Sequence, residues 1–221
     1  MFSVRPLFDN REDAGYKLAA ELSKLNLKNI LILAIPCGGV PVGISIAKEL
    51  ATEFNLMIVR KLQIPWNPEA GFGAITPDGT YLLNPNLAPH LNLSDIKIQE
   101  IKSRTLAEIE RRRQRFCGNR SSPEIRDRPV ILVDDGLASG YTMLVAAKSV
   151  KKAKPSQLIV ASPVASISAA NLLKSECDTL VALHVSSAVP FAVASFYKHW
   201  HDLSDEEVIH YLKSFKGNDE C

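Results

Sequence analysis

The stretch 130-VILVDDGLASGYT-142 decides the fold and the site that we expect in this chain. Its four leading residues, up to Val133, are apolar and mostly β-branched, which predicts a buried strand. Asp134 and Asp135 stand where that strand would end. The small residues Gly136 to Gly140 then predict a loop, and residues 142–152 have the composition of a helix.

This arrangement of residues suits a sugar phosphate. A loop that enters the N-terminus of a helix aims backbone N–H groups and a partial positive charge at one spot, and that spot favours a phosphate. Ser139 and Thr142 can add hydroxyl donors, and the carboxylates of Asp134 and Asp135 can accept from sugar hydroxyls. The alternative is an ordinary strand-to-helix turn with acidic caps. The combination of residue types favours a site that holds a ribose 5-phosphate from both ends.

Bulk properties favour a single domain over residues 1–221. The formal net charge is +2, so no large field attracts the chain to nucleic acid or to a membrane surface. No apolar run approaches the roughly 20 residues that span a bilayer, and the N-terminal residues lack an apolar signal region. The four cysteines are scattered without metal or disulfide spacing. We therefore expect a cytoplasmic protein with reduced thiols, no protein-held metal and no membrane partner.

Helices alternate with apolar strands along the chain, which predicts an α/β fold with a doubly wound parallel sheet. Residues 63–92, rich in Pro and Gly, interrupt this rhythm and carry short strand candidates at 72–75 and 80–83. Asp9 with Glu12, and Ser204 with Glu207, have the spacing of capping boxes. We expect helices at residues 9–25, 42–54, 94–116, 142–152, 166–175 and 204–215, and strands at 29–35, 56–60, 130–134, 157–164 and 179–185.

Two further segments lie where a phosphate-binding enzyme needs them. Gly38 and Gly39 follow the first strand and allow the backbone to approach a ligand closely, although a simple connector explains them too. Arg60 and Lys61 are expected at the carboxyl end of the next strand, the edge where open α/β sheets bind ligands. The alternative is that these two basic side chains only take part in ion pairs at the protein surface.

The segment at 130–142 resembles the phosphoribosyl-pyrophosphate (PRPP) motif of the type I phosphoribosyltransferases, and residues 9–208 resemble a little-characterised bacterial and archaeal branch of that family. Weaker matches are Gly39-Val40-Pro41, Asn67-Pro68-Glu69 and the tail from Pro190 to Val208. The resemblance implies that Asp134 and Asp135 bind the ribose hydroxyls. It implies a 5-phosphate cradle made by Ala138, Ser139, Gly140, Tyr141 and Thr142, and it places Gly136 among the substrate-binding residues.

The resemblance also implies a pyrophosphate loop formed by Cys37, Gly38 and Gly39. The family often has Lys or Arg where this chain has Cys37, so cations must come from elsewhere, and the family implies Arg60 and Lys61. It further implies a cis peptide, which alignment puts at Cys37–Gly38, and Mg²⁺ bound mainly through PRPP. Cys37 is interpreted as a small filler, because no activating His or Lys is near it in sequence. The hood over the site is expected from residues 63–92 and the C-terminal tail, 187–221.

We therefore expect transfer of a 5-phosphoribosyl group from PRPP to a nitrogen acceptor, with release of pyrophosphate. Ala138 stands where 6-oxopurine enzymes have a carboxylate for proton transfer, which disfavours those acceptors and leaves the acceptor open. The alternative is a PRPP- or nucleotide-sensing regulator without catalysis. A dinucleotide binder fits less well, because residues 38–43 lack the G-x-G-x-x-G spacing.

Three features carry other expectations. The aromatic residues between Pro190 and His201 are interpreted as packing for the tail rather than a base-stacking platform. The basic run from Glu108 to Arg115 is interpreted as a solvated helix face with internal ion pairs, so no nucleic-acid partner is expected. A homodimer is left open by hood residues that either meet a partner or pack on their own core. These residues are Ile64, Trp66, Phe72, Leu82 and Leu83.

Overall fold

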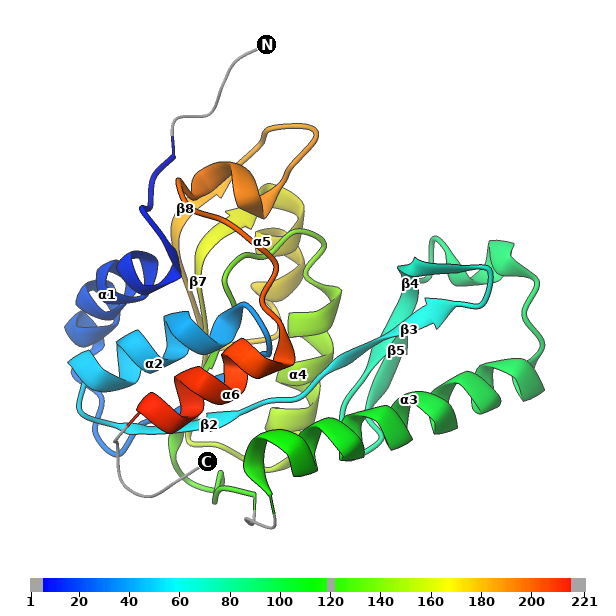
Figure 1. Ribbon diagram of the computed structural model, residues 1–221, viewed down its shortest axis with the longest axis horizontal. Coiled ribbons are helices and arrows are strands. Elements are labelled where there is room, and N and C mark those ends of the chain that lie inside the picture. Colours follow the sequence, from blue (N-terminus) through cyan, green and yellow to red (C-terminus); the bar gives the residue numbers. More distant parts are fainter. Residues whose placement is uncertain (1–5, 119–121, 216–221) are drawn as a thin grey trace.

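The computed structural model describes residues 6–118 and 122–215, apart from the side chains of Pro68 and Glu69. Its core is a parallel five-stranded sheet, and a smaller antiparallel sheet projects to one side (Figure 1). Across the core sheet the strands lie in the order β2 (Glu53–Leu56), β1 (Leu31–Ala34), β6 (Pro129–Val133), β7 (Gln157–Ser166) and β8 (Thr179–Ser186).

Helices cover both faces of the core sheet because alternate residues of each strand point to opposite sides. Ile32 and Ile131 pack with α1 (Arg11–Leu22), α2 (Gly39–Glu49) and α6 (Asp205–Ser214). Leu33 and Leu132 pack on the other face with α4 (Tyr141–Lys152) and α5 (Ile167–Leu173). The doubly wound parallel sheet expected from the sequence is therefore confirmed.

The projecting hood consists of β3 (Arg60–Ile64), β4 (Asn67–Ile75) and β5 (Tyr81–Leu83), followed by the short 3-10 helix η2 (Ala88–Leu91). The long helix α3 (Asp95–Cys117) runs along the hood and back to the core, where it contacts α6 (Figure 1). Phe72 and Ile64 are buried inside the hood, Leu82 and Leu83 are partly buried, and Trp66 is 64% exposed. Most of the hood's apolar residues therefore pack on their own chain.

The expected strand at 56–60 is wrong at both ends. β2 ends at Leu56, and Arg60 is the first residue of hood strand β3. Met57, Ile58 and Val59 are nevertheless buried, because this crossing from the core to the hood packs into both hydrophobic clusters of the protein. A short apolar run indicates burial and does not by itself indicate a paired strand.

Two helix starts differ from expectation. Asn10, not Asp9, caps α1, and its side chain accepts a hydrogen bond from the Asp13 backbone N–H at 2.8 Å. Helix α2 begins at Gly39 rather than residue 42, because Gly38 already has helical dihedral angles and Pro41 is tolerated in a first turn. The capping box of Ser204 and Glu207 at α6 is confirmed.

The C-terminal tail does not join the hood sheet. Its 3-10 helix η3 (Val193–Phe196) and the residues after it lie against the core, and α6 packs on α2 and α3. Phe196, Tyr197 and Trp200 pack in one aromatic cluster with Phe8 near the N-terminus, as interpreted from the sequence. Among the described residues, the hood is therefore formed by residues 60–91, with α3 alongside it and no segment of the tail. Residues 216–221 of the expected tail lie outside the described part. Within that part, no helix is both long enough and apolar enough to cross a membrane.

Candidate functional site

The two glycine-containing loops meet at the carboxyl edge of the core sheet. Ala34 and Val133 are partners in the β1–β6 register, and the Ile35 N–H donates to the Val133 carbonyl at 2.9 Å. A Cβ built on Gly39 would lie 2.7 Å from that same carbonyl oxygen, and one built on Gly38 would lie 1.9 Å from Asp135 Oδ2. No side chain larger than hydrogen fits at residue 38 while Asp135 keeps its position.

The first of these loops contains a cis peptide between Pro36 and Cys37. The expected position, Cys37–Gly38, is wrong by one residue. Gly38 is the N-cap of α2 and has helical dihedral angles (φ −62°, ψ −34°), so the irregular backbone precedes it.

The carboxylate of Asp135 is held by a buried arginine. Arg11 Nε donates to Asp135 Oδ2 at 2.8 Å, and Arg11 is only 6% exposed. Its Nη1 donates to the backbone carbonyl of His201 at 2.9 Å, and its guanidinium lies 3.8 Å from the centre of the Trp200 ring. Arg11 therefore joins α1, the C-terminal tail and the second acidic residue of the motif.

The two neighbouring carboxyls affect each other's ionisation. Burial, together with the charge of Asp135, raises the pKa of Asp134 well above its usual value. Burial also raises the pKa of Asp135, although Arg11 opposes this. The backbone N–H of Asp135 donates to Asp134 Oδ1 at 2.9 Å, and the Tyr197 hydroxyl donates to the Asp135 carbonyl at 2.6 Å. Burial raises the pKa of Tyr197, so its phenol remains a donor.

The loop from Gly136 to Gly140 extends the sheet and then opens into α4. The Leu137 N–H donates to the Val164 carbonyl at 2.9 Å, which fixes the loop beside β7. Gly140 adopts φ +78° at the N-cap of α4, and no side chain caps the first turn. Among the described residues, the hydroxyls of Ser139 and Thr142 have no hydrogen-bond partner. This helix N-terminus can therefore receive an external anion.

The rest of the loop contacts neighbouring segments. Ala138 is exposed, and its carbonyl accepts from Ser166 Oγ at 2.6 Å. The Tyr141 hydroxyl donates to Asn84 Oδ1 of the hood at 3.4 Å. A Cβ on Gly136 would lie 2.3 Å from Val193 Cγ1, so the C-terminal tail packs directly on the loop.

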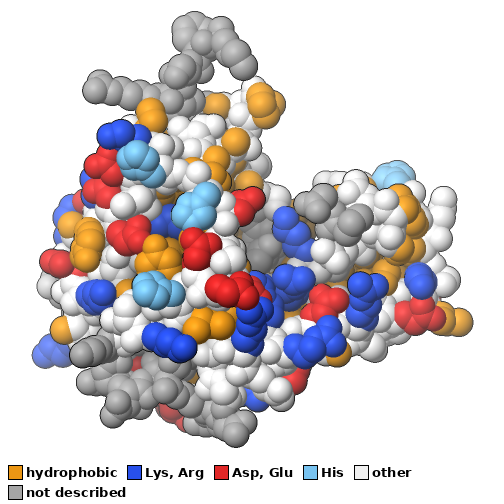
Figure 2. Space-filling model, viewed as in Figure 1, with side chains coloured by type: hydrophobic (Ala, Val, Ile, Leu, Met, Phe, Trp, Pro, Cys, Tyr) orange, Lys and Arg blue, Asp and Glu red, His pale blue; other side chains and the backbone are white. Residues whose placement is uncertain are grey.

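A cavity of about 330 Å³ opens beside the carboxyl edge of the core sheet, and three basic side chains line it. Arg60 Nη2 lies 3.4 Å from Glu108 Oε2, whereas Lys61 is exposed and has no ion-pair partner in the described part of the chain. Basic side chains gather over α3, near the hollow between core and hood (Figure 2). The cavity is lined by Ile35, Pro36, Val59, Arg60, Lys61, Gln63, Arg112, Asp134 and Thr142.

Similarity to known proteins agrees with this geometry. The family described as "Phosphoribosyl transferase domain" matches residues 5–195, which is most of the chain. The chain belongs to the phosphoribosyltransferase family. The crystal structure of the Thermus thermophilus protein TT1426 is 32% identical with a TM-score of 0.78, and the match covers 95% of this chain and 99% of that one.

Two Mycobacterium tuberculosis proteins, from strains H37Rv and CDC 1551, are each 34% identical over 206 residues. They are named "Putative phosphoribosyl transferase Rv0571c" and "Putative phosphoribosyl transferase MT0597". The match covers 93% of this chain but only 46% of theirs, so this chain spans about half their length.

Several residues near the candidate site leave no signal in the sequence. Arg11 gave no signal, because its partner Asp135 is 124 positions away. Arg112 was included in the run interpreted as a solvated helix face. That interpretation holds for Arg113, which pairs with Glu110, but the Arg112 side chain is only 16% exposed and lines the cavity. Its position four residues after Glu108 is the signal that could have identified it, since such residues share a helix face.

Cys37 also lies in this group. Burial raises the pKa of its thiol despite the nearby guanidinium of Arg112, which agrees with a filler rather than a reactive thiolate. Among the described residues, no group of three His, Cys, Asp or Glu side chains could hold a metal ion.

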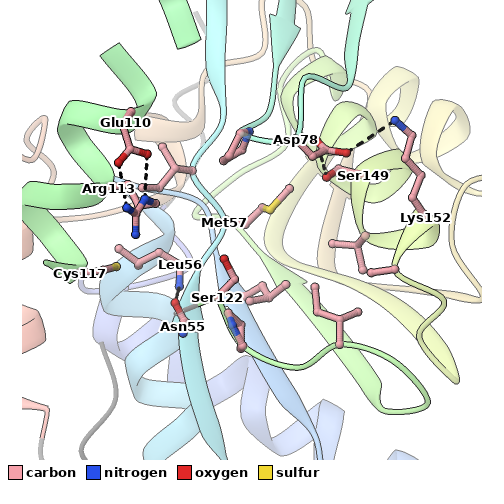
Figure 3. A pocket seen from close by; sticks show the side chains of 17 residues that line it. Asn55, Leu56, Met57, Asp78, Glu110, Arg113, Cys117, Ser122, Ser149 and Lys152 are labelled. Atoms are coloured by element: carbon pink, nitrogen blue, oxygen red, sulfur yellow. Dashed lines mark hydrogen bonds and ion pairs between the residues drawn. The ribbon is translucent and has the colours of Figure 1, made fainter. Parts of the chain in front are cut away.

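A second cavity, of about 600 Å³, lies where residues of β2, the crossing segment, α3 and α4 meet (Figure 3). It shares no lining residue with the first. Its lining includes Leu56, Met57, Asp78 and Lys152, and Lys152 Nζ lies 3.6 Å from Asp78 Oδ2. The candidate site is the smaller of these two cavities with the loops beside it, because that cavity is lined by Arg60, Lys61 and Asp134.

Proposed function

We propose that the protein transfers a 5-phosphoribosyl group from PRPP to a nitrogen acceptor and releases pyrophosphate. The observation that carries this proposal is the contact of Gly38 with the Asp135 carboxylate at the sheet edge. That contact brings a loop suited to pyrophosphate and a pair of carboxylates suited to ribose within the reach of one ligand. The uncapped N-terminus of α4 lies at the end of the same motif.

In this proposal the ribose 5-phosphate end is bound by residues 134–142. The carboxylates of Asp134 and Asp135 accept hydrogen bonds from the ribose hydroxyls. Backbone N–H groups of the loop and the hydroxyls of Ser139 and Thr142 donate to the 5-phosphate, where the dipole of α4 also favours negative charge. The cradle comprises Ala138, Ser139, Gly140, Tyr141 and Thr142, and Gly136 is proposed to contact the substrate beside it.

The pyrophosphate end is bound by the loop of Cys37, Gly38 and Gly39, with Arg60 and Lys61 as cations. During transfer the bond from C1 of ribose to the pyrophosphate oxygen breaks, and a bond from C1 to the acceptor nitrogen forms while that nitrogen loses a proton. Negative charge develops on the departing oxygen, so the cations and N–H groups lower the barrier.

Mg²⁺ is proposed to enter with PRPP. This ion prefers few protein ligands and many substrate oxygens, and Asp134 lines the cavity where a substrate diphosphate would lie. When bound, Mg²⁺ would neutralise part of the diphosphate charge.

The acceptor class is narrowed by residue 138. Ala138 has no proton to give or take where 6-oxopurine enzymes have a carboxylate, so we propose another nitrogen acceptor, such as a pyrimidine, adenine or a non-base amine. We further propose a cytoplasmic location, because the cysteines show no disulfide spacing.

The test is pyrophosphate release from Mg-PRPP in the presence of a panel of bases and small amines. Release that depends on one acceptor supports the transferase. PRPP binding without release for any acceptor, with ligand-dependent association with another macromolecule, supports the sensing regulator instead. Absence of PRPP binding contradicts the transferase and the PRPP sensor.

A further inference from the structure

The pyrophosphate loop lacks a cation of its own. In the family this chain resembles, a Lys or Arg often stands where Cys37 is found, and Cys37 supplies no positive charge. Any diphosphate in the cavity therefore needs cations from outside the loop. On the basis of the proposed function, we propose that Arg112 of α3 is the residue that binds the pyrophosphate in place of a loop cation.

The position of Arg112 supports this role. Its Nη2 lies 3.0 Å from Cys37 Sγ, so the guanidinium sits beside the residue that would otherwise carry the charge. Arg112 also lines the cavity together with Lys61 and Asp134. The guanidinium thus brings to the loop, from a helix 75 residues later in the chain, the charge that the loop lacks.

The C-terminal helix orients this guanidinium. Asp205, the first residue of α6, accepts from Arg112 Nε at 3.3 Å and also from Nη2. Arg112 Nη1 makes no hydrogen bond with any described residue, which leaves two N–H donors for phosphate oxygens. A planar guanidinium fixed along one edge is preorganised for an oxyanion along the other. Asp205 is therefore a positioning residue.

A purely structural role predicts a different pattern of ligand affinities. If Arg112 only clamps α3 to α6, its loss affects every ligand of the site alike. If Arg112 binds pyrophosphate, its loss lowers the affinity for ligands that contain the diphosphate. The affinity for ribose 5-phosphate, which lacks the diphosphate, stays the same.

The experiment compares three titrations by calorimetry: Mg-pyrophosphate, Mg-PRPP and ribose 5-phosphate. Arg112→Gln removes the charge but can still donate to Asp205. We expect this variant to bind pyrophosphate and PRPP about ten- to a hundredfold more weakly, as for the loss of a charged hydrogen bond. Its affinity for ribose 5-phosphate should change less than about twofold. Arg111→Gln is the matched control, because Arg111 is exposed on the same helix and is not a lining residue of the cavity. It should leave all three affinities unchanged.

A rescue variant strengthens the test. Cys37→Lys combined with Arg112→Gln should restore much of the pyrophosphate affinity, because it returns a cation to the loop at the position that the guanidinium occupied. Should Arg112→Gln fail to fold, Arg112→Lys is the second variant, because it keeps the charge but loses the planar, forked arrangement of N–H donors. Its affinity for pyrophosphate should fall, and its affinity for ribose 5-phosphate should not.

The outcomes separate this inference from the proposed function. Wild-type protein that binds neither PRPP nor ribose 5-phosphate overturns the proposed function itself. Wild-type protein that binds PRPP, with unchanged pyrophosphate affinity in Arg112→Gln, overturns only the role of Arg112. Equal losses for pyrophosphate and ribose 5-phosphate also overturn it, because that pattern belongs to a structural clamp.

Discussion

At the scale of single residues, the contact between Gly38 and Asp135 is the tightest constraint in the site. The Asp135 carboxylate fills the space that a side chain at residue 38 would need, and Arg11 holds that carboxylate in place. The ion pair of Arg11 and Asp135 can therefore form only while residue 38 is a glycine.

Replacing Gly38 by Ala tests this dependence. The added methyl must push Asp135 away from Arg11, so we expect PRPP affinity to fall at least about tenfold and stability to fall by about 1–3 kcal/mol. Calorimetry and urea unfolding measure the two effects. Gly79→Ala is the control, because Gly79 has open space around it and only its φ of +79° opposes a side chain. It should lose stability without losing affinity, and an unchanged Gly38→Ala protein would contradict the geometry.

The ionisation of Asp134 leads to a second prediction. Its pKa is raised in the folded protein, so the folded state binds this proton more tightly than the unfolded state, where the usual value is 3.8. The contribution of Asp134 to stability is therefore fully present below that value and is lost as pH rises through the folded pKa.

We accordingly expect the difference in stability between Asp134→Asn and wild type to move in favour of the variant as pH rises from 4. Urea unfolding of both proteins at a series of pH values measures this difference. A difference that stays constant across the series would show that burial does not perturb Asp134.

The residues of the acidic motif could be read from the sequence because they adjoin one strand. Arg11 could not, since a long-range ion pair leaves no periodic pattern in either partner. The same holds for Asp205, which accepts a hydrogen bond from Arg112, a residue 93 positions earlier on another helix.

At the scale of elements, α6 attaches the C-terminal tail to α2 and α3. Its capping box fixes the first turn, and that turn contains Asp205, which pairs with Arg112 of α3. The start of this helix could be predicted because Ser204 and Glu207 lie at capping spacing. The start of β3 could not, because the apolar residues 57–59 are as consistent with a strand as with a buried crossing.

Ser204→Ala should destabilise the protein by about 1 kcal/mol, because the first turn of α6 loses its cap. Equilibrium unfolding in urea measures this. Ser187→Ala is the matched control, since Ser187 is exposed and makes no hydrogen bond with the described residues. Equal stabilities for the two variants would argue that the tail is held by packing alone.

At the scale of the whole molecule, residues of the hood and of the core line the candidate site together. Lys61 and Arg60 come from the hood, Arg112 comes from the helix that connects hood to core, and the carboxylates come from the core. The alternation of strands and helices was sufficient to predict the core. The path of residues 60–117 was not predictable, because Pro- and Gly-rich sequence specifies turns without specifying which way the hairpin projects.

The hood also bears on assembly. Trp66 is 64% exposed, whereas Ile64 and Phe72 pack inside the hood. We expect a twofold dimer in which the hood contacts the partner near Trp66. Light scattering of dilute protein should give about twice the chain mass of 24.3 kDa, and Trp66→Lys should return the monomer mass. A monomeric wild type that still turns over PRPP would rule out a site shared between subunits.

The central claim is that Asp134 and Asp135 bind the ribose of PRPP, and one measurement tests it most directly. Mg-PRPP is titrated by calorimetry into the wild type and into a variant with both Asp134→Asn and Asp135→Asn, after circular dichroism has shown that both are folded. We predict saturable binding to the wild type and no measurable binding to the variant. A folded variant that binds Mg-PRPP with wild-type affinity would contradict the claim and would make these carboxylates structural caps.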